Sequence, residues 1–159
     1  MQMSNAGLNL LREFEGLRTS VYKDVAGLDT IGYGHRVLPA ESFPSGITPA
    51  QADQILSGDV AIAEAAVTRL LKVPVNQGQF DALVDFTFNL GAARLGGSTL
   101  LRELNAGHPA TAAQELLKWD HCNGVVNAGL LRRRKAELAL WTAADPAPDP
   151  ATAPALQPV

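Results

Sequence analysis

The stretch from residue 15 to residue 35 changes from a helical pattern to a strand pattern, and this change constrains the fold most. Apolar residues at helical spacing lie between Ser4, a predicted N-cap, and Gly16, a predicted helix stop. After Gly16, β-branched and aromatic residues flank a Val-Ala-Gly-Leu-Asp turn. The pattern predicts an amphipathic helix that leads directly into a β-hairpin.

The same stretch carries two carboxyl groups and a hydroxyl, Glu15, Asp24 and Thr30. Helix phase places Glu15 about 70° from the centre of the apolar stripe and Glu13 about 130° away, so only Glu15 borders the core. Partial burial and the negative end of the helix favour a protonated Glu15, whereas Asp24 in a solvated turn should stay ionised. Glycosidic bond hydrolysis uses such a pair, and Thr30 offers a hydroxyl that can orient a water.

The rest of the chain predicts a helical body. Thr48 to Gln51 form a capping box that starts a helix running to about Lys72, with a break near Ser57 and Gly58. A second cap at Asn76 starts a strongly apolar helix that ends at Gly91. Shorter helices are predicted to begin at Ser98 and at Pro109.

Residues 120–127 are predicted to form a loop before a last helix over 128–143. Its leucines and Trp141 are expected to face inward, and the basic run Arg132 to Lys135 is expected at the surface. From residue 144 the chain is rich in Ala and Pro, so 144–159 is predicted to be a disordered tail. The fold class is therefore α+β and mainly helical, with one domain over 1–143.

Composition excludes several classes of protein. The chain has 159 residues, a net charge of −3 and one cysteine, which argues against a nucleic-acid partner and against a disulfide framework. Its histidines lack ligand spacing, so no metal and no cofactor are predicted, and Cys122 is expected to be inert. It has no signal-peptide pattern and no apolar run of about 20 residues. We therefore expect a protein made in the cytosol, without stable membrane insertion.

The motifs of residues 15–35 resemble the signature of the phage-type lysozymes, the muramidase endolysins of tailed bacteriophages. The resemblance rests on Glu15-Gly-Leu-Arg18, Tyr22-Lys-Asp24 and Gly27-Leu-Asp-Thr30-Ile-Gly-Tyr-Gly-His35. It continues through 79–91, 98–101, Trp119 and 129–137, and so covers about residues 5–142. The acidic isoelectric point and the Asp-His-Cys-Asn-Gly loop after Trp119 depart from the pattern of many relatives.

The resemblance implies a lysozyme-like fold, with a small β-hairpin lobe, a larger helical lobe and a cleft between them. It also implies hydrolysis of the β-1,4 bond between N-acetylmuramic acid and N-acetylglucosamine in peptidoglycan. Glu15 resembles the general acid, and Asp24 the carboxylate that activates water or stabilises the oxocarbenium ion. Thr30 resembles the residue that positions the water, and the family leans towards inversion at the anomeric carbon.

Further site residues follow from the same resemblance. Arg133 or Arg134 is expected to approach Glu15, and the sequence does not choose between them. His35 either tunes Glu15 or fixes the hairpin, and the second reading is favoured. The sugar contacts implied by the resemblance are Arg36, Phe88, Asn89 and Ser98.

The expected partner is bacterial peptidoglycan, reached by a monomer that waits in the host cytoplasm until a holin-like protein opens the membrane. Two alternatives are a lytic transglycosylase, which needs one acid alone, and a non-catalytic wall-binding relative. The presence of Asp24 and Thr30 argues against the first, and the presence of both carboxyl groups argues against the second.

Overall fold

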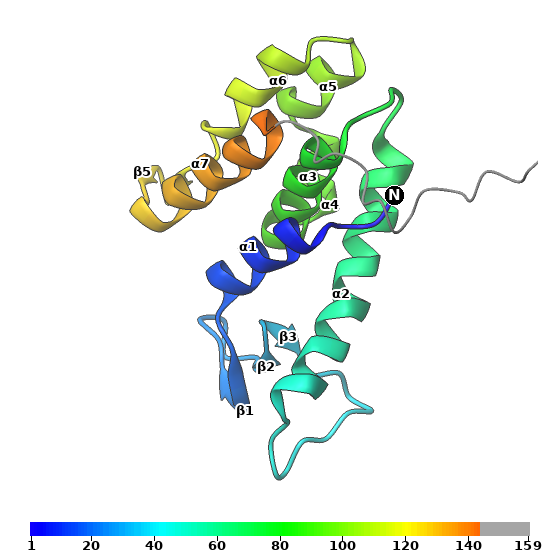
Figure 1. The fold of residues 1–159 in the computed structure, drawn as a ribbon. Helices are drawn as coiled ribbons and strands as arrows, with labels where there is room; N and C mark the ends of the chain where they lie inside the picture. Colours follow the sequence, from blue (N-terminus) through cyan, green and yellow to red (C-terminus); the bar gives the residue numbers. More distant parts are fainter. Residues whose placement is uncertain (144–159) are drawn as a thin grey trace, which may run out of the picture.

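The computed structural model describes residues 1–143, in which helices predominate and the strands form two small sheets (Figure 1). The elements, in chain order, are α1 (Asn5–Glu15), β1 (Arg18–Lys23), β2 (Asp29–Gly32), β3 (His35–Arg36), α2 (Pro49–Leu70), α3 (Gln77–Leu90), α4 (Ala92–Gly96), α5 (Thr99–Asn105), α6 (Pro109–Leu116), β4 (His121–Cys122), β5 (Val125–Val126) and α7 (Ala128–Thr142). This architecture confirms the prediction of a mainly helical α+β fold. The predicted tail, 144–159, lies outside the described residues.

Helix α3 is the centre of the helical body. Every residue from Phe80 to Thr87 is buried, and the helix packs against α1, α2, α4 and α7 (Figure 1). Asn76 is the predicted N-cap, and it forms a capping box in which the side-chain oxygen of Gln79 accepts a hydrogen bond from the Asn76 backbone N–H. A helix that is apolar on nearly all sides is stable only inside a body of other helices, which explains its central position.

The first sheet lies at one end of the molecule, between the end of α1 and the start of α2 (Figure 1). Its strands pair antiparallel in the order β1-β2-β3, with Tyr22 opposite Thr30 and Ile31 opposite His35. Ile31 packs with Ile47 and Ala52 in a small separate core that joins the sheet to α2. The predicted hairpin is confirmed, and the structure adds a third strand to it.

Helix α2 is continuous over 22 residues and runs from the sheet into the helical body (Figure 1). The predicted break near Ser57 and Gly58 is therefore wrong. A glycine inside a helix costs about 1 kcal/mol relative to alanine. Leu56 and Val60 are buried on either side of it, and their burial outweighs that cost.

The region of residues 120–127, predicted to be a loop, forms a second small hairpin of β4 and β5. Its turn is Asn123-Gly124, and both residues have positive φ, 51° and 77°. Asn-Gly is the dipeptide that two-residue hairpin turns favour, because both positions require left-handed backbone. The sequence therefore contained a turn signal that the prediction of a loop overlooked.

Helix α7 buries different residues from those predicted. Trp141 is buried as expected, but the three leucines expected to face inward are partly exposed. The buried positions include Arg133, Arg134 and Glu137, so the prediction of a surface basic run is wrong for the two arginines. Ion-pair partners on α1 and α3 explain their burial, as described below.

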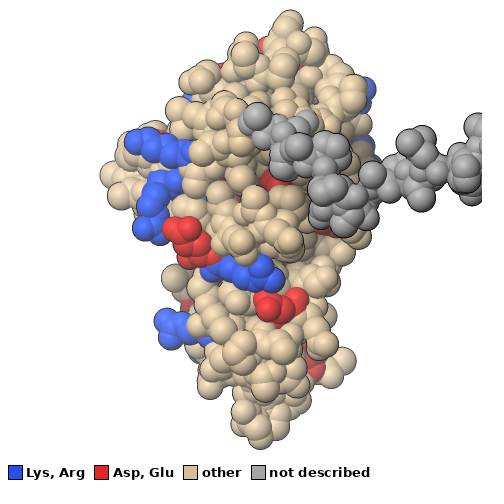
Figure 2. Space-filling view, viewed as in Figure 1, with Lys and Arg blue, Asp and Glu red and all other residues tan. Residues whose placement is uncertain are grey.

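On the face drawn in Figure 2, basic and acidic side chains lie close to one another, and wide uncharged areas surround them. No single sign of charge covers this face, in keeping with the small net charge of −3. Within residues 1–143, no helix combines the length and the apolar character needed to cross a membrane.

Candidate active site

Glu15 is the last residue of α1, and Gly16, with φ of 69°, turns the chain away towards the sheet. The side chain of Glu15 is mostly buried, with 20 % of its surface exposed, whereas Glu13 faces solvent, as helix phase predicts. Oε1 accepts a hydrogen bond from Nη1 of Arg133 at 2.6 Å. Oε2 faces the turn between β2 and β3, where a Cβ on Gly34 would lie 3.3 Å from it. The carboxyl group is therefore enclosed between the helical body and the sheet.

Arg133, rather than Arg134, is the arginine that contacts Glu15. Its Nε and Nη2 donate to the two oxygens of Asp85 on α3, at 2.8 Å and 3.0 Å. Burial by itself would lower the pKa of Arg133, but the paired bonds to Asp85 and the charge of Glu15 outweigh it and raise that pKa above its usual value. Arg133 is thus a fixed cation beside Glu15.

Arg134 forms a second buried ion pair next to the first. Its Nη2 donates to Oε1 of Glu137 at 2.6 Å and to Oδ1 of Asn89 at 3.0 Å. Burial raises the pKa of Glu137 well above its usual value, and burial also lowers the pKa of Arg134. The Asn89 amide oxygen is therefore committed to an internal hydrogen bond.

Asp24 lies in the turn directly after β1 and is held by its own loop. Its Oδ1 accepts hydrogen bonds from the backbone N–H groups of Ala26 and Leu28, at 2.8 Å and 2.9 Å. Two backbone donors stabilise the ionised form of a carboxyl group. Thr30 is buried in β2, and its hydroxyl donates to the carbonyl oxygen of Leu28 at 3.1 Å. The Thr30 oxygen can still accept a hydrogen bond.

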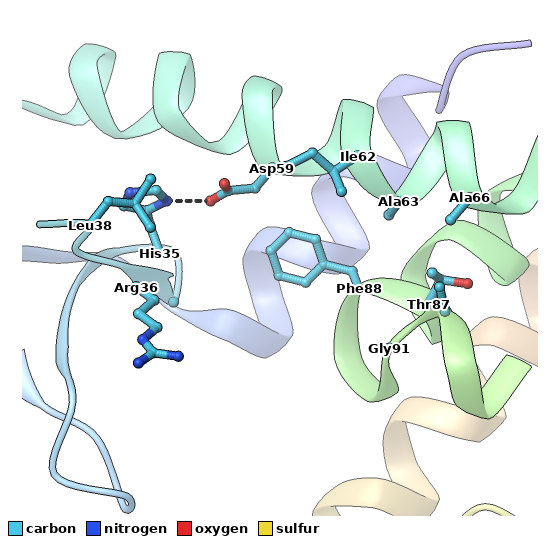
Figure 3. Close-up of a pocket in the computed structure, with 12 residues that line it drawn as sticks. His35, Arg36, Leu38, Asp59, Ile62, Ala63, Ala66, Thr87, Phe88 and Gly91 are labelled. Atoms are coloured by element: carbon cyan, nitrogen blue, oxygen red, sulfur yellow. Dashed lines mark hydrogen bonds and ion pairs between the residues drawn. The ribbon is translucent and has the colours of Figure 1, made fainter. Parts of the chain in front are cut away.

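A cavity of about 420 Å³ opens between the sheet, α2 and the end of α3 (Figure 3). Gly34 lies at its rim, so the cavity reaches the turn that faces Glu15. Two of the predicted sugar contacts, Arg36 and Phe88, line this cavity. Figure 3 shows the Phe88 ring projecting from α3 towards the side of the cavity that Arg36 occupies. Ser98 is instead buried as the N-cap of α5, where its hydroxyl donates to Leu95 and accepts from Leu101.

His35 joins three parts of the molecule. Its Nδ1 lies 2.8 Å from Oδ2 of Asp59 on α2, drawn as a dashed line in Figure 3, and its Nε2 lies 2.9 Å from Oε2 of Glu41. Burial alone would lower the pKa of His35, but these two carboxylates outweigh it and raise the pKa. A neutral imidazole can donate one hydrogen bond, whereas the charged form donates both. In the structure, therefore, the polar atoms of His35 bind Asp59 and Glu41, not Glu15.

The described residues contain no group of three or more His, Cys, Asp or Glu side chains placed to hold a metal ion. Cys122 is exposed and unpaired on β4.

The family model for phage lysozyme matches residues 12–137. The chain belongs to the phage lysozyme family. The endolysin of Bacillus phage B103 is 45 % identical to this family member over 149 residues, or 89 % of the chain and 54 % of the relative. The endolysin of Salmonella phage P22 is 38 % identical over 144 residues, or 89 % of the chain and 98 % of the relative.

Solved structures of the family agree with the fold. The muramidase domain of SpmX from Asticaccaulis excentricus superposes with a TM-score of 0.82 at 37 % identity, covering 90 % of this chain and 99 % of that one. The chain matches about half the length of the Bacillus phage relative but nearly all of the P22 relative. The family assignment inferred from the motifs is confirmed.

The sequence reasoning missed Asp85, Asp59 and Glu41. A signal for Asp85 was present, because Asp81 and Asp85 stand four residues apart within an otherwise apolar helix. Buried carboxylates need partners, and Asp81 has them in the backbone N–H of Ser4 and the side chain of Gln77. The partner of Asp85 lies 48 positions away on another helix, which no local pattern reveals.

Proposed function

We propose that this family member is an endolysin that hydrolyses the β-1,4 bond between N-acetylmuramic acid and N-acetylglucosamine in bacterial peptidoglycan. The observation that carries the proposal is the position of Glu15. Its partly buried carboxyl group lies at the junction of the sheet and the helical body, beside Gly34, which lines the open cavity, so a sugar chain bound in that cavity would pass close to it. Family membership supplies the reaction class.

In the proposed mechanism Glu15 is the general acid. Its proton passes to the glycosidic oxygen while the bond from that oxygen to the anomeric carbon breaks, which leaves positive charge on the sugar ring. Asp24 stabilises that charge or removes a proton from the attacking water. The two backbone hydrogen bonds to Oδ1 of Asp24 support this role, because they favour the anion that the step requires.

Thr30 is proposed to position the water, because its oxygen can accept a hydrogen bond while its proton is held by Leu28. Among the proposed sugar contacts, Arg36 and Phe88 are supported by their place in the cavity wall. Asn89 and Ser98 have weaker support, since their side chains make internal hydrogen bonds. We further propose that the chain acts as a monomer and reaches the wall from the host cytoplasm after a holin-like protein opens the membrane.

The test is digestion of purified peptidoglycan followed by mass spectrometry of the soluble muropeptides. Wild-type protein should release fragments with reducing N-acetylmuramic acid ends, and Glu15→Gln should release at least a hundredfold less because it has no proton to donate. Glu13→Gln is the matched control, since Glu13 lies two positions away in solvent, and it should act like wild type. Clearing by Glu15→Gln at the wild-type rate would contradict the assignment of the acid, and 1,6-anhydro ends would indicate a transglycosylase.

A further inference from the structure

Arg133 is shared between two carboxyl groups of different character. Asp85 is fully buried and binds Nε and Nη2, whereas Glu15 is partly exposed and binds Nη1. Because a guanidinium group is planar, the two bonds to Asp85 fix its orientation. Nη1 is then the nitrogen left to point at Glu15. The geometry of the Glu15 contact is therefore set from α3, through Asp85.

The charge of Arg133 acts against the role proposed for Glu15. A general acid must carry a proton, and a cation at 2.6 Å favours the ionised carboxylate. Asp85 supplies an opposite charge on the far side of the same guanidinium, with its own side chain fully buried. Water screens charges weakly in such a site, so Asp85 offsets much of the pull that Arg133 exerts on Glu15.

Two more ionisable groups of α7 belong to the same cluster. Arg134 adds a second buried cation, and Glu137 pairs with it at 2.6 Å. Burial raises the pKa of Glu137, which weakens Glu137 as a counter-charge to the two arginines. Asn89 is neutral. Asp85 is then the carboxyl group that binds Arg133 from the buried side of this cluster.

We propose that Asp85 is a positioning residue for Glu15: it orients Arg133 and offsets part of the charge that Arg133 presents to Glu15. This inference rests on the proposed role of Glu15 as general acid. Asp85 acts through Arg133 and needs no contact with the sugar. Replacing Asp85 should therefore change the pH dependence of catalysis, whereas replacing a purely structural residue would leave that pH dependence unchanged.

The first experiment compares Asp85→Asn with wild type, as full 159-residue chains, on peptidoglycan suspensions from pH 4 to pH 9 at constant ionic strength. The alkaline limb of the activity profile should move down by about one pH unit, because Glu15 then faces Arg133 without the offsetting charge. Activity at the optimum should also fall. A folded Asp85→Asn protein whose alkaline limb coincides with that of wild type would overturn the proposal.

The matched control is Glu137→Gln, which removes another buried carboxyl group of the cluster. Glutamine keeps the size of Glu137 and an oxygen that can accept from Arg134, so Asp85 and Arg133 stay in place and the alkaline limb should stay at the wild-type pH. A downward shift as large as that of Asp85→Asn would mean that any disturbance of the cluster has this effect, and would also overturn the proposal.

A second variant covers the case in which Asp85→Asn does not fold, since breaking a buried ion pair on one side is strongly destabilising. The double variant Asp85→Asn, Arg133→Gln removes both charges and leaves none unpaired. Glu15 then loses its cation, and the alkaline limb should move up by about one pH unit relative to wild type. An alkaline limb at the wild-type pH would show that Asp85 and Arg133 do not control the protonation of Glu15, and would overturn the proposal. If wild-type protein releases no muropeptides, the proposed function fails; if it does and these limbs stay in place, this inference alone fails.

Discussion

The two oxygens of Glu15 have different neighbours, and each neighbour restricts the carboxyl group in its own way. Oε1 is held by the Arg133 guanidinium, whose orientation comes from Asp85. Oε2 faces Gly34, where φ is 82° and a Cβ would lie 3.3 Å away. Residue 34 therefore needs a left-handed backbone and also leaves little room for a side chain beside the proposed acid.

Gly34→Ala should lower activity on peptidoglycan by roughly tenfold or more, because the added methyl group displaces the Glu15 carboxyl from its position. The matched control is Gly27→Ala, whose φ of 79° is nearly the same but whose Cβ would have no neighbour within 4 Å. Both variants should lose about 1–2 kcal/mol of stability in urea denaturation, since alanine is strained at positive φ. Equal activity of the two, per mole of folded protein, would contradict the crowding of Glu15.

For single residues, the sequence predicts those features that depend on nearby positions in the chain. Glu15, Asp24 and Thr30 lie within one helix end and one hairpin, so helix phase and turn chemistry single them out as candidates, and the resemblance to the phage-type lysozymes supplies the roles predicted for them. The choice between Arg133 and Arg134 needed the structure, because neighbouring helix positions differ by about 100° in direction and the partner helix was unknown. The burial of both arginines was unpredictable for the same reason.

Single helices were predicted well where the start signal lies in the sequence itself. The capping box at Thr48 and the N-cap at Asn76 are present as predicted. The errors arose where packing decides, as in the uninterrupted course of α2 through Gly58. They also arose where a short signal was overlooked, as in the Asn123-Gly124 turn between β4 and β5.

Gly58→Ala should stabilise the protein by about 1 kcal/mol, because α2 is helical there and alanine has the higher helix propensity. A Cβ at this position would meet no atom within 4 Å, so no clash opposes the gain. Gly78→Ala on α3 is the opposite control, since its Cβ would lie 2.1 Å from the carbonyl oxygen of Leu140. Thermal unfolding should give a higher midpoint for Gly58→Ala and a lower one for Gly78→Ala. A lower midpoint for Gly58→Ala would contradict a continuous helix α2 at this position.

The molecule as a whole depends on few links between its sheet and its helical body. One is the continuous helix α2, and another is the small core of Ile31, Ile47 and Ala52. A third is His35 on β3, which binds Asp59 of α2 and Glu41 of the loop before α2. The last of these is electrostatic and so depends on pH.

The stability contributed by His35 should decline as the pH rises. Because its pKa is raised in the folded protein, its contribution is complete below the unfolded value of 6.5 and is lost as the pH rises through the folded value. The backbone N–H of Leu38 and the bond to His35 lower the pKa of Glu41, so its contribution is present above 4.5 and is lost as the pH falls through its folded value. The link is therefore strongest between these two pH values.

Urea denaturation of wild type and His35→Gln at pH 5.5, 7 and 8.5 measures this contribution. The difference in unfolding free energy between the two proteins should be largest at pH 5.5 and smallest at pH 8.5. Glu64→Gln serves as a control on α2 that leaves His35 and its two partners in place. A difference that stays constant over this range would exclude a charged His35 as a pH-dependent link.

The hydrogen bond from Arg133 to Glu15 joins residues 118 positions apart, and this separation has a consequence for synthesis. Helix α1 packs on α3 and α7, so a chain still on the ribosome has made Glu15 long before its partner helix emerges. The sheet of β1, β2 and β3 can form early, but the contact between Arg133 and the Glu15 carboxyl group can form only after α7 has left the exit tunnel. A ribosome-bound chain that lacks α7 therefore has the residues of the proposed acid site without its geometry.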